Sequence, residues 1–533
     1  MEKLTKTDFI LYLKCPKNVW IKWHMPEEYS KFEISEFEKS LGIMGVDVEE
    51  EARKRFPGGY LVKGRGKDSQ EETKKLIAKK EPIIFQAVFS TEKFLAATDV
   101  LRWNTKANAY DIYEIKMSSV EEENEDSDEE TDKPKKVNKQ KEEQYEQDLA
   151  FQTNVAKLCG VNFNKKYLVR LNKQYIKKGN LDPQKLFEET DKTEVMSEAF
   201  LSNVSVKMDA SYEYLSKDKM PAGPCDCYYR GRSAQCTSFI ISNPTVPEYS
   251  IHDLNRIGSS KEFIKTLLDR PEPILNIEDV PEHEIPKPSK RKDGTPGIPR
   301  KLYQVQVHKS KEPMVNYDAI KKELDALTYP LYFLDYETYP TALPIYDGYH
   351  PYQHVVFQYS IHILRNKDAK PEHEECLITE GDPAEKIVAG LRKHIGNTGH
   401  VISWSKKFEN SRNRELAKLV SSQADFLHDV IRRTYDLMDI VENQYYVHPE
   451  FRGKSTIKKV QTVLAPKLEY KKLKIKNGTD AIEAYRQIFE GEVTGKDLEA
   501  KKLDMLKYCG YDTEVMYVIW KFFQDLIKEH EAR

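Results

Sequence analysis

Short segments rich in β-branched and aromatic residues occur in two groups, and this distribution constrains the fold more than any other feature of the chain. The first group lies between residues 83 and 116, and the second lies between residues 329 and 404. A Lys- and Pro-rich stretch, 281–299, has the composition of a linker and separates them. At 533 residues the chain is also too long for one ordinary hydrophobic core. We therefore expect two domains.

The first half of the chain is expected to contain a sheet with flanking helices. Branched and aromatic runs predict strands at 83–89, 93–101 and 109–116. A highly charged run, 118–146, follows them, and nine carboxylates but no Lys or Arg lie between residues 121 and 132. Because such a segment cannot bury apolar surface, it is predicted to be a disordered acidic insertion.

Strands and helices alternate in the second half of the chain. The pattern predicts strands at 329–335, 355–364, 375–379 and 400–404, and helices at 384–395, 408–419 and from 504 onward. This alternation indicates an α/β sheet with helical crossovers.

Composition excludes some classes of protein and leaves others open. The net charge of −3 argues neither for nor against a polyanionic partner. No run of roughly 18 apolar residues is present, so no membrane span is expected. Charges interrupt residues 1–17, which argues against a signal peptide and for a cytoplasmic protein. Seven cysteines, an odd number, favour metal ligation or free thiols over a disulfide framework.

A first acidic set lies in the first group of strands. Glu114 and Lys116 are two residues apart on one expected strand, so their side chains share a face, and Asp99 lies on the strand before it. Two carboxylates can hold a hard divalent cation, while a lysine orients the attacking water. The alternative is the charged solvent face of an edge strand.

The order of these elements resembles the RecB-like branch of the PD-(D/E)XK nucleases. A helix with Glu49 precedes the hairpin with Asp99, and a helix with Gln152 follows the Glu-Ile-Lys strand. The resemblance implies a restriction-endonuclease-like fold that uses Mg²⁺ or Mn²⁺. It implies metal ligands at Glu49 (or Glu50), Asp99 and Glu114, and catalytic roles for Lys116 and Gln152. The family's Gln-x-x-x-Tyr motif is half present, because Ala156 stands at the tyrosine position.

Four cysteines form a candidate metal centre. Cys225, Cys227 and Cys236 lie close together in sequence, and Cys15 lies far upstream in a Cys-Pro pair. Four thiolates satisfy either tetrahedral zinc or an iron-sulfur cluster. The split arrangement is similar to the iron-sulfur staple of CRISPR-adaptation nucleases in the same RecB-like branch, which implies a 4Fe-4S cluster. The tight Cys-x-Cys spacing keeps zinc as the alternative.

A second acidic set lies in the second half. Asp335 and Glu337 share one face at the end of an expected strand, Glu409 opens a helix, and Asp512 follows Tyr508 by one helical turn. Four carboxylates can hold two divalent ions about 4 Å apart, with Tyr508 orienting the attacking water. Lys454–Lys476 is Lys-rich and could track a phosphate backbone, or be a solvated face.

The second set resembles the DEDD exonucleases of the RNase H-like fold, in the variant whose third motif is Tyr-x-x-x-Asp. Tyr508 and Asp512 match that motif, whereas Glu409 stands where the family's second motif has Asp. The chain as a whole is similar to an uncharacterised bacterial family that fuses a RecB-like domain to such an exonuclease domain. This implies a RecB-like domain at 1–280, a linker at 281–315 and an exonuclease domain at 316–533.

These resemblances imply a metal-dependent nuclease that hydrolyses DNA or RNA, with a 3′-to-5′ exonuclease in its C-terminal domain. Neither half carries a base-reading motif, so single strands or ends are the expected substrates. The alternative is a catalytically inactive nucleic-acid-binding or assembly module, for which the departures at Ala156 and Glu409 are the reason.

Overall fold

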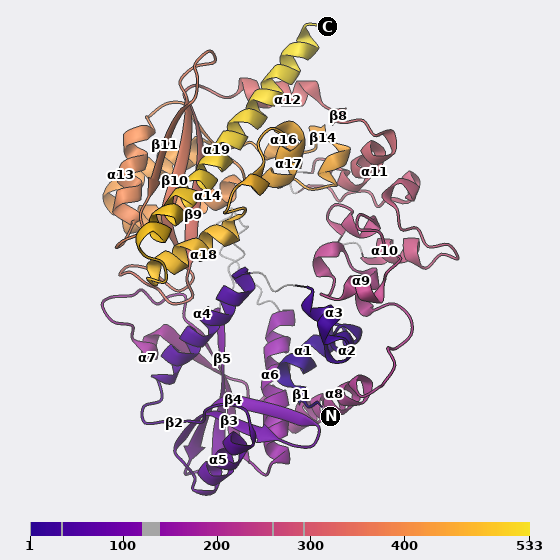
Figure 1. The fold of residues 1–533 in the computed structure, drawn as a ribbon, viewed down its shortest axis with the longest axis vertical. Coiled ribbons are helices and arrows are strands. Elements are labelled where there is room, and N and C mark those ends of the chain that lie inside the picture. The colour runs from indigo at the N-terminus through magenta and orange to yellow at the C-terminus, as the bar shows by residue number, and fades with distance from the viewer. Residues whose placement is uncertain (1, 33–35, 120–138, 258–260, 292–293) are drawn as a thin grey trace. The chain divides into compact units, whose positions relative to one another are not determined.

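A computed structural model describes residues 2–32, 36–119, 139–257, 261–291 and 294–533. The chain forms two compact units (Figure 1). The first unit comprises Met1–Tyr228, Cys236–Pro244 and Thr341–Gln353, and the second comprises Tyr229–Gln235, Thr245–Pro340 and His354–Arg533. Each unit combines helices with a mixed sheet, so the α/β class expected from the sequence is confirmed.

The first unit contains a seven-stranded mixed sheet in the order β2-β3-β4-β5-β6-β7, with β1 paired to β4. The hairpins β3–β4 and β4–β5 are antiparallel, and β6 returns parallel to β5 after a helix. The strands are β1 (Leu4–Thr5), β2 (Tyr60–Leu61), β3 (Ile83–Ser90), β4 (Phe94–Asn104), β5 (Ala109–Ser119), β6 (Phe163–Leu171) and β7 (Phe187–Asp191).

Helices cover this sheet, and α1, α2, α6 and α8 contribute apolar side chains to its main core. Phe151 of α6 stacks on Phe9 of α1 and also contacts Phe94 of β4. The helices of this unit are α1 (Lys6–Lys14), α2 (Pro16–His24), α3 (Pro26–Ser30), α4 (Glu36–Arg53), α5 (Lys67–Ala78), α6 (Lys139–Leu158), α7 (Pro183–Leu186), α8 (Glu198–Leu215) and α9 (Phe239–Ser242).

The expected acidic insertion at 118–146 is shorter at both ends. Strand β5 continues to Ser119, and α6 begins at Lys139. The start of α6 is ordered because its carboxylates are paired: Glu142 lies 2.7 Å from Arg170, and Lys192 lies 2.8 Å from Glu146. The remainder of the expected insertion, 120–138, lies outside the described residues.

The second unit contains a five-stranded sheet in the order β11-β10-β9-β12-β13. Strands β9, β10 and β11 are antiparallel neighbours, whereas β12 and β13 run parallel to β9. The strands are β9 (Leu331–Pro340), β10 (His354–Leu364), β11 (Glu372–Leu377), β12 (His400–Ser403) and β13 (Thr434–Asp436), and a separate pair is β8 (Met314–Val315) with β14 (Tyr446–Val447).

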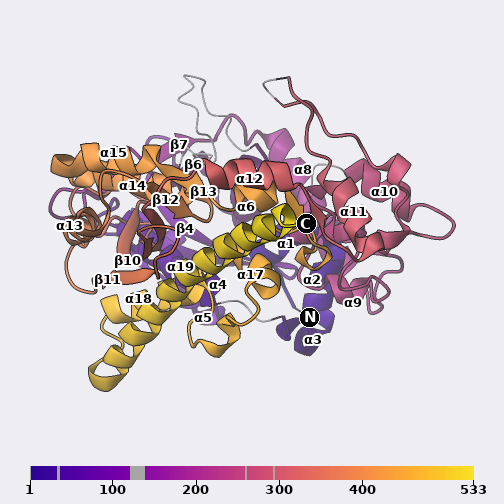
Figure 2. The same ribbon diagram turned by 90° about the horizontal axis from the view of Figure 1, so that it is seen from above.

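The central strand β9 has two buried faces. Tyr332, Leu334 and Tyr336 pack into a core with α13, α14 and α15, whereas Phe333 on the other face contacts Trp520 of α19. Helix α19 lies across β9, β10 and β11 and is one continuous 37-residue helix (Figure 2). It is longer than the helix predicted from Asp504 onward.

The helices of the second unit are α10 (Lys261–Leu268), α11 (Arg300–Ser310), α12 (Tyr317–Asp325), α13 (Ala384–His394), α14 (Lys406–Leu419), α15 (Ala424–Arg432), α16 (Asp439–Glu442), α17 (Ile457–Leu464), α18 (Gly478–Phe489) and α19 (Gly495–Glu531). Among the described helices, none combines the length with the apolar content needed to cross a bilayer.

The expected linker at 281–315 is partly helical. It contains α11, which buries Gln304, Val305 and Val307 within the second unit. The division between the units falls near residue 244, and 245–280 groups with the second unit rather than with the first. The Lys- and Pro-rich stretch that suggested a linker lies directly before this helix and belongs to the second unit.

A short segment between β9 and β10 belongs to the first unit. Asp347 of Thr341–Gln353 accepts hydrogen bonds from Nζ of Lys177 at 2.7 Å and from the backbone N–H of Gly179 at 3.0 Å. The backbone N–H of Lys177 also donates to the carbonyl of Tyr349 at 3.0 Å. The first unit is therefore completed by residues far along the chain.

Candidate functional site

The structure brings Asp99, Glu114 and Lys116 together on neighbouring strands. The Nζ of Lys116 donates to Oε1 of Glu114 at 2.7 Å, and Asp99 Oδ2 accepts from the backbone N–H of Ile115 at 2.8 Å. Asp99 and Glu114 are both buried. The strand-pair arrangement expected for the first acidic set is thus present, with its carboxylates pointing into the protein rather than to solvent.

Glu49 and Gln152 join this set through hydrogen bonds. Nε2 of Gln152, which is fully buried, donates to Oε2 of Glu114 at 2.6 Å. Glu49 is connected to Asp99 through Gln86. The amide of Gln86 donates to Glu49 and, at 3.3 Å, to Oδ1 of Asp99. Glu50 is exposed, so Glu49 is the member of that pair that reaches the site.

Gln86 was not among the residues singled out from the sequence. It has φ of 54° in the middle of β3, in the left-handed region that non-glycine residues seldom adopt. The register of β3 with β4 is the same on both sides of Gln86, with Phe85 opposite Val100 and Ala87 opposite Thr98, so Gln86 lies opposite Asp99. Strained backbone of this kind is frequent at functional sites.

Two further charged residues of the first set were also missed. Nζ of Lys6, at the start of α1, lies 2.8 Å from Oε1 of Glu114 and 3.8 Å from Oδ1 of Asp148. Asp148 of α6 also pairs with Lys116 and accepts from Gln152 at 3.3 Å. Sequence offers no local signal for Lys6, because only the parallel pairing of β1 with β4 carries it to this position.

Lysine side chains offset the carboxylate charges of the first set. Burial favours the uncharged form of Glu114, but the ammonium groups of Lys116 and Lys6 outweigh it and lower the pKa of Glu114 below its usual range. Burial and the nearby Glu114 raise the pKa of Asp99 to about 8. Asp99 is therefore largely protonated at neutral pH, and two lysines offset Glu114 and Asp148.

The four predicted cysteines form one cluster in the first unit. The Sγ atoms of Cys15, Cys225, Cys227 and Cys236 all lie within 4.8 Å of one another, and those of Cys225 and Cys236 are 3.9 Å apart. Three of the thiols are buried, and Cys236 is partly exposed. This set could hold a metal ion.

Hydrogen bonds around the cysteines connect the segment that carries Cys15 to the distant segment that carries the other three. Cys15 lies between α1 and α2, and Pro16 starts the second of these helices. The side-chain oxygen of Asn18 accepts from the backbone N–H of Ser238 at 3.0 Å, and Asn243 donates to the sulfur of Cys225 at 3.3 Å. Polar groups thus connect the α2 segment to the segment that carries Cys236, as is usual around metal ligands.

The second acidic set gathers around the face of β9 that meets α19. Asp335 and Glu337 point to this face because side chains alternate along a strand. Their carboxylates and the sulfur of Cys509 lie within 4.8 Å of one another. Glu409, in the first turn of α14, and Asp512 of α19 are buried within electrostatic range of Asp335, outside that tighter group.

Lys458 and Arg412 offset the charge of the second set only in part. Burial and the other carboxylates of the set raise the pKa of Asp335, Glu337 and Glu409 well above their usual values. Burial raises the pKa of Asp512 to about 6. Oε2 of Glu409 is buried without a hydrogen-bond partner among the described residues. Buried carboxylates in this state attract a cation.

Tyrosines and one lysine surround Asp512. The hydroxyl of Tyr470 donates to its carboxylate, and the nearby hydroxyl of Tyr508 favours the charged form of Asp512 and so acts to lower its pKa. Nζ of Lys458 lies 5.3 Å from the ring centre of Tyr470 and 5.4 Å from that of Tyr508. Burial and Asp512 raise the pKa of Tyr508, so it is a neutral hydrogen-bond donor at physiological pH. Cys509, Tyr470 and Lys458 were not assigned to this site from the sequence, although Lys458 lies in the Lys-rich stretch.

Other polar residues near β9 have structural roles. Asp436 accepts from the backbone N–H groups of Ser405 at 2.9 Å and Lys406 at 2.8 Å, and so caps the start of α14. His354 bonds to the hydroxyl of Thr338, and burial lowers its pKa to about 3. His362 contacts the hydroxyl of Thr513 at 2.8 Å.

Comparison with known proteins matches one part of the chain. Residues 332–456 match the model of a domain of unknown function (DUF2779). This match includes Asp335, Glu337 and Glu409 and ends before Tyr508 and Asp512. No curated protein matches the chain significantly.

Proposed function

We propose that the second unit is a metal-dependent nuclease that hydrolyses phosphodiester bonds of DNA or RNA. The observation that carries the proposal is that Asp335, Glu337, Glu409 and Asp512 are buried together, and that neighbouring carboxylates raise the pKa of the first three. Burying several carboxylates together is costly unless a cation neutralises them. The four carboxylates offer oxygen donors, which suit Mg²⁺ or Mn²⁺, and the sulfur of Cys509 is the one other potential donor that converges with Asp335 and Glu337 among the described residues.

Each residue of the second site is assigned a separate role in hydrolysis. Asp335 and Glu337, whose ligand atoms converge most closely, would hold the cation, with Glu409 and Asp512 completing the cage. A bound divalent ion supplies Lewis acidity at the phosphate and lowers the pKa of water. Tyr508, a neutral donor, orients the attacking water by its hydroxyl, and Lys458 offsets the charge of the phosphate. An RNase H-like 3′-to-5′ exonuclease is the activity that this arrangement supports best.

The first unit is proposed to contain a second, RecB-like site. It differs from the first proposed site because lysine ammonium groups already contact its carboxylates. Glu49, Asp99 and Glu114 would hold the cation, Gln152 positions Glu114, and Lys116 faces the phosphate. Lys6 already lies 2.8 Å from Glu114, so a cation has to displace its ammonium group. This contact favours a second candidate role for the first unit, in which it binds nucleic acid without cleaving it.

For the cysteine cluster we propose one structural metal centre. Four sulfurs at about 2.3 Å from a tetrahedral zinc ion are roughly 3.8 Å apart. The sulfurs here converge within 4.8 Å, and one pair is 3.9 Å apart, which favours zinc, the alternative from the sequence, over the larger 4Fe-4S cluster. Four reduced thiols also fit a cytoplasmic location.

A nuclease assay tests the functional proposal. Purified full-length protein is incubated with end-labelled single- and double-stranded DNA and RNA, in Mn²⁺ and in EDTA. Cleavage in Mn²⁺ is expected, and Asp335→Ala should lower one activity by on the order of 100-fold or more. Lys116→Ala should remove a distinct activity if the first site also cleaves. Asp318→Ala and Lys165→Ala are controls away from both sites.

The assay has clear opposing outcomes. Full cleavage by both Asp335→Ala and Lys116→Ala would overturn the assignment of both sites. Loss of cleavage in Asp335→Ala alone assigns binding, rather than hydrolysis, to the first unit. For the cysteine centre, metal analysis should give one zinc per chain, whereas a brown anaerobic preparation with visible absorbance and about four irons per chain would support the iron-sulfur cluster.

A further inference from the structure

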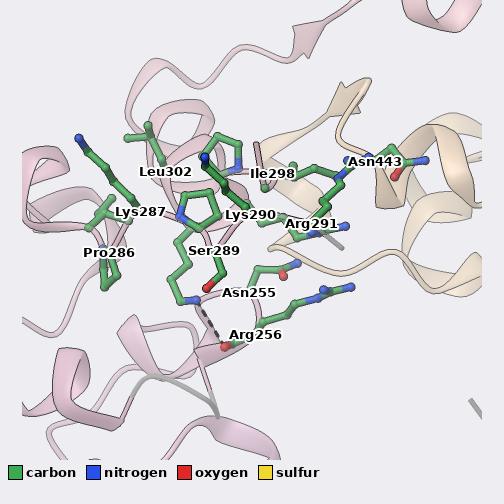
Figure 3. A pocket seen from close by; sticks show the side chains of 16 residues that line it. Asn255, Arg256, Pro286, Lys287, Ser289, Lys290, Arg291, Ile298, Leu302 and Asn443 are labelled. Atoms are coloured by element: carbon green, nitrogen blue, oxygen red, sulfur yellow. Dashed lines mark hydrogen bonds between the residues drawn. The ribbon is translucent and has the colours of Figure 1, made fainter. Parts of the chain in front are cut away.

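The loop that resembled a linker in sequence forms the wall of a pocket in the second unit. The pocket has a volume of about 690 Å³, which lies in the range of small-molecule and cofactor sites. It is lined by the 285–291 and 297–302 segments, together with Asn255, Arg256 and Asn443. Arg256, Arg291 and Asn443 lie on one side of the pocket, and Pro286 and Lys287 lie on the other (Figure 3).

The pocket wall is strongly basic. Six of its residues are cationic: Arg256, Lys287, Lys290, Arg291, Arg300 and Lys301. The described lining contains no aspartate or glutamate. Glu442, which lies outside the lining, pairs with Arg256 at 2.7 Å and with Arg300 at 3.2 Å. The pocket wall therefore has six cationic side chains, and Glu442 pairs with two of them.

The start of α11 adds to this positive potential. Pro299, Arg300, Lys301 and Leu302 line the pocket, and they form the first turn of the helix. Pro299 at the N-cap supplies no side-chain cap, and the first turn of the helix has no acidic residue. The N–H groups at a helix N-terminus attract anions, and here they act together with the basic side chains.

The loop is held in a closed shape. The backbone N–H of Arg291 donates to the carbonyl of Thr295 at 2.9 Å, and Gly297 packs against the backbone of Ser289. A Cβ on Gly297 would lie 2.2 Å from the carbonyl oxygen of Ser289, so only glycine permits this approach. These two contacts hold together the segments before and after residues 292–293, which carry several of the basic side chains.

The cations of the pocket interact unfavourably with one another. Burial and the neighbouring Arg256 lower the pKa of both Arg300 and Lys301. Lys301 also donates to the backbone carbonyl of Arg256, at 3.4 Å (Figure 3). An anion placed between these groups relieves their repulsion.

We propose that this pocket binds backbone phosphates of a nucleic-acid strand and so extends the binding surface of the second unit beyond the carboxylate set. The inference rests on the proposed nuclease function for the identity of the ligand. Arginine forks bind phosphate oxygens in a bidentate manner, and lysines act as point charges beside them. Contacts to phosphate alone carry no sequence preference, which agrees with a nuclease that acts on single strands or ends.

Binding measurements on the full-length protein test the inference. Fluorescence anisotropy with labelled single-stranded 20-mers of DNA and RNA is recorded in EDTA, so that binding is read without cleavage. The double variant K290A/R291A should weaken binding by about tenfold or more. It should also reduce the slope of log Kd against log salt concentration by about 1.4, because each of two lost phosphate contacts to a single strand contributes roughly 0.7. Both residues are exposed, so folding should be preserved.

The matched control is K367A/K370A, which removes two exposed lysines from a loop of the same unit outside the pocket. The inference is supported if K367A/K370A binds the oligonucleotide with the Kd of the wild type while K290A/R291A binds it more weakly. A second variant, Lys287→Glu, should weaken binding further by reversing a charge. Equal Kd values for wild type and K290A/R291A, within twofold, would overturn the inference.

Competitors distinguish the sources of phosphate. An unlabelled oligonucleotide should compete well below the concentration needed for inorganic phosphate or a mononucleotide. Binding to anionic phospholipid vesicles that is lost in K290A/R291A, with unchanged oligonucleotide binding, would assign the pocket to a membrane surface and overturn the inference. If oligonucleotides bind through the pocket but no cleavage occurs in Mn²⁺, the nuclease proposal fails and the phosphate-binding inference stands.

Discussion

Nζ of Lys6 lies 2.8 Å from Oε1 of Glu114, although 108 residues separate them in sequence. The contact gives the first unit a cation within its carboxylate set before any metal binds. A similar contact is absent from the described part of the second set, where Lys458 lies over tyrosine rings. The two sets therefore differ in charge balance, although both combine buried carboxylates with a lysine.

Removing the ammonium group of Lys6 should strengthen cation binding at the first set. Lys6→Met keeps the length of the side chain and removes a positive charge that competes for Glu114. We expect Mn²⁺ to bind about tenfold more tightly, which corresponds to about 1.4 kcal/mol. Calorimetric titration in an Asp335→Asn background isolates the first set.

The control for Lys6 is Lys22→Met, which breaks the 2.6 Å contact between Lys22 and Asp8 outside the carboxylate set. Its Mn²⁺ affinity should equal that of the background protein. Unchanged or weaker Mn²⁺ binding in Lys6→Met would show that Lys6 supports Glu114 rather than competing with a cation.

Neutralising Glu409 should separate stability from activity. Oε2 of Glu409 is buried without a partner among the described residues, and burial disfavours its charged form. Glu409→Gln should therefore raise the free energy of unfolding by about 1 kcal/mol, and Tm by about 2–4 °C. The Mn²⁺-dependent activity should fall by on the order of 100-fold. Thermal melts and the nuclease assay measure the two effects.

Glu385→Gln, an exposed carboxylate in the first turn of α13, is the matched control. It should change neither quantity beyond error. A destabilised Glu409→Gln protein with full activity would contradict the role of Glu409 in the cation cage.

The cysteine centre should stabilise the first unit through its metal. Cys227→Ser removes one of four converging sulfurs, so the bound metal should be lost and the first unfolding transition should move down by several kcal/mol. Elemental analysis and differential scanning calorimetry measure these changes. Cys159→Ser, at an exposed thiol outside the cluster, should retain metal and stability. Equal metal content in both variants would exclude Cys227 as a ligand.

Stability of the second unit should decline in mild acid through His362. Burial and the neighbouring His373 lower the pKa of His362 from 6.5 to about 4. The unfolded chain takes up this proton near pH 6.5 and the folded chain only near pH 4. The stabilising contribution of neutral His362 is thus complete above pH 6.5 and is lost as pH falls through 4.

Urea unfolding at several pH values between 4 and 7.5 tests this prediction. His362→Gln cannot titrate, so its stability should fall less steeply with acid than that of the wild type, by at most about 3 kcal/mol. His283→Gln is the control, because the side chain of His283 is 84% exposed. An identical slope for wild type and His362→Gln would assign the acid sensitivity to other groups.

The elements that carry both acidic sets could be predicted because their side-chain pattern is local. On β9 the alternation of Tyr332, Leu334 and Tyr336 with Phe333 and Asp335 follows directly from a strand with two buried faces. The expected α/β class was confirmed for the same reason. Spacing on a strand or helix also places Glu114 beside Lys116.

Contacts that depend on the three-dimensional fold could not be predicted from one sequence. Lys6 reaches Glu114 through the pairing of β1 with β4, and Gln86 reaches Asp99 through a left-handed backbone conformation. Tyr470 approaches Asp512 from the start of a short 3-10 helix, 42 residues away in sequence. None of these residues stands in a periodic pattern that marks it.

The expected linker shows how composition can mislead. Lys and Pro residues are typical of solvated connections, but here they line a pocket in a loop where Gly297 packs closely against Ser289 and α11 follows. A basic loop held in shape has the same composition as a flexible one. The two are distinguished by the buried side chains that follow it, Val305 and Val307.

The contribution of Asp347 to the first unit limits how this protein can be divided for expression. A fragment that ends at Pro244 lacks Thr341–Gln353, and leaves Lys177 and Gly179 without the carboxylate that they contact in the intact chain. A fragment that begins after Pro244 carries those residues away from their partners. Cutting the chain once therefore yields no intact half, and genetic dissection of the two candidate sites requires point variants in the full-length protein.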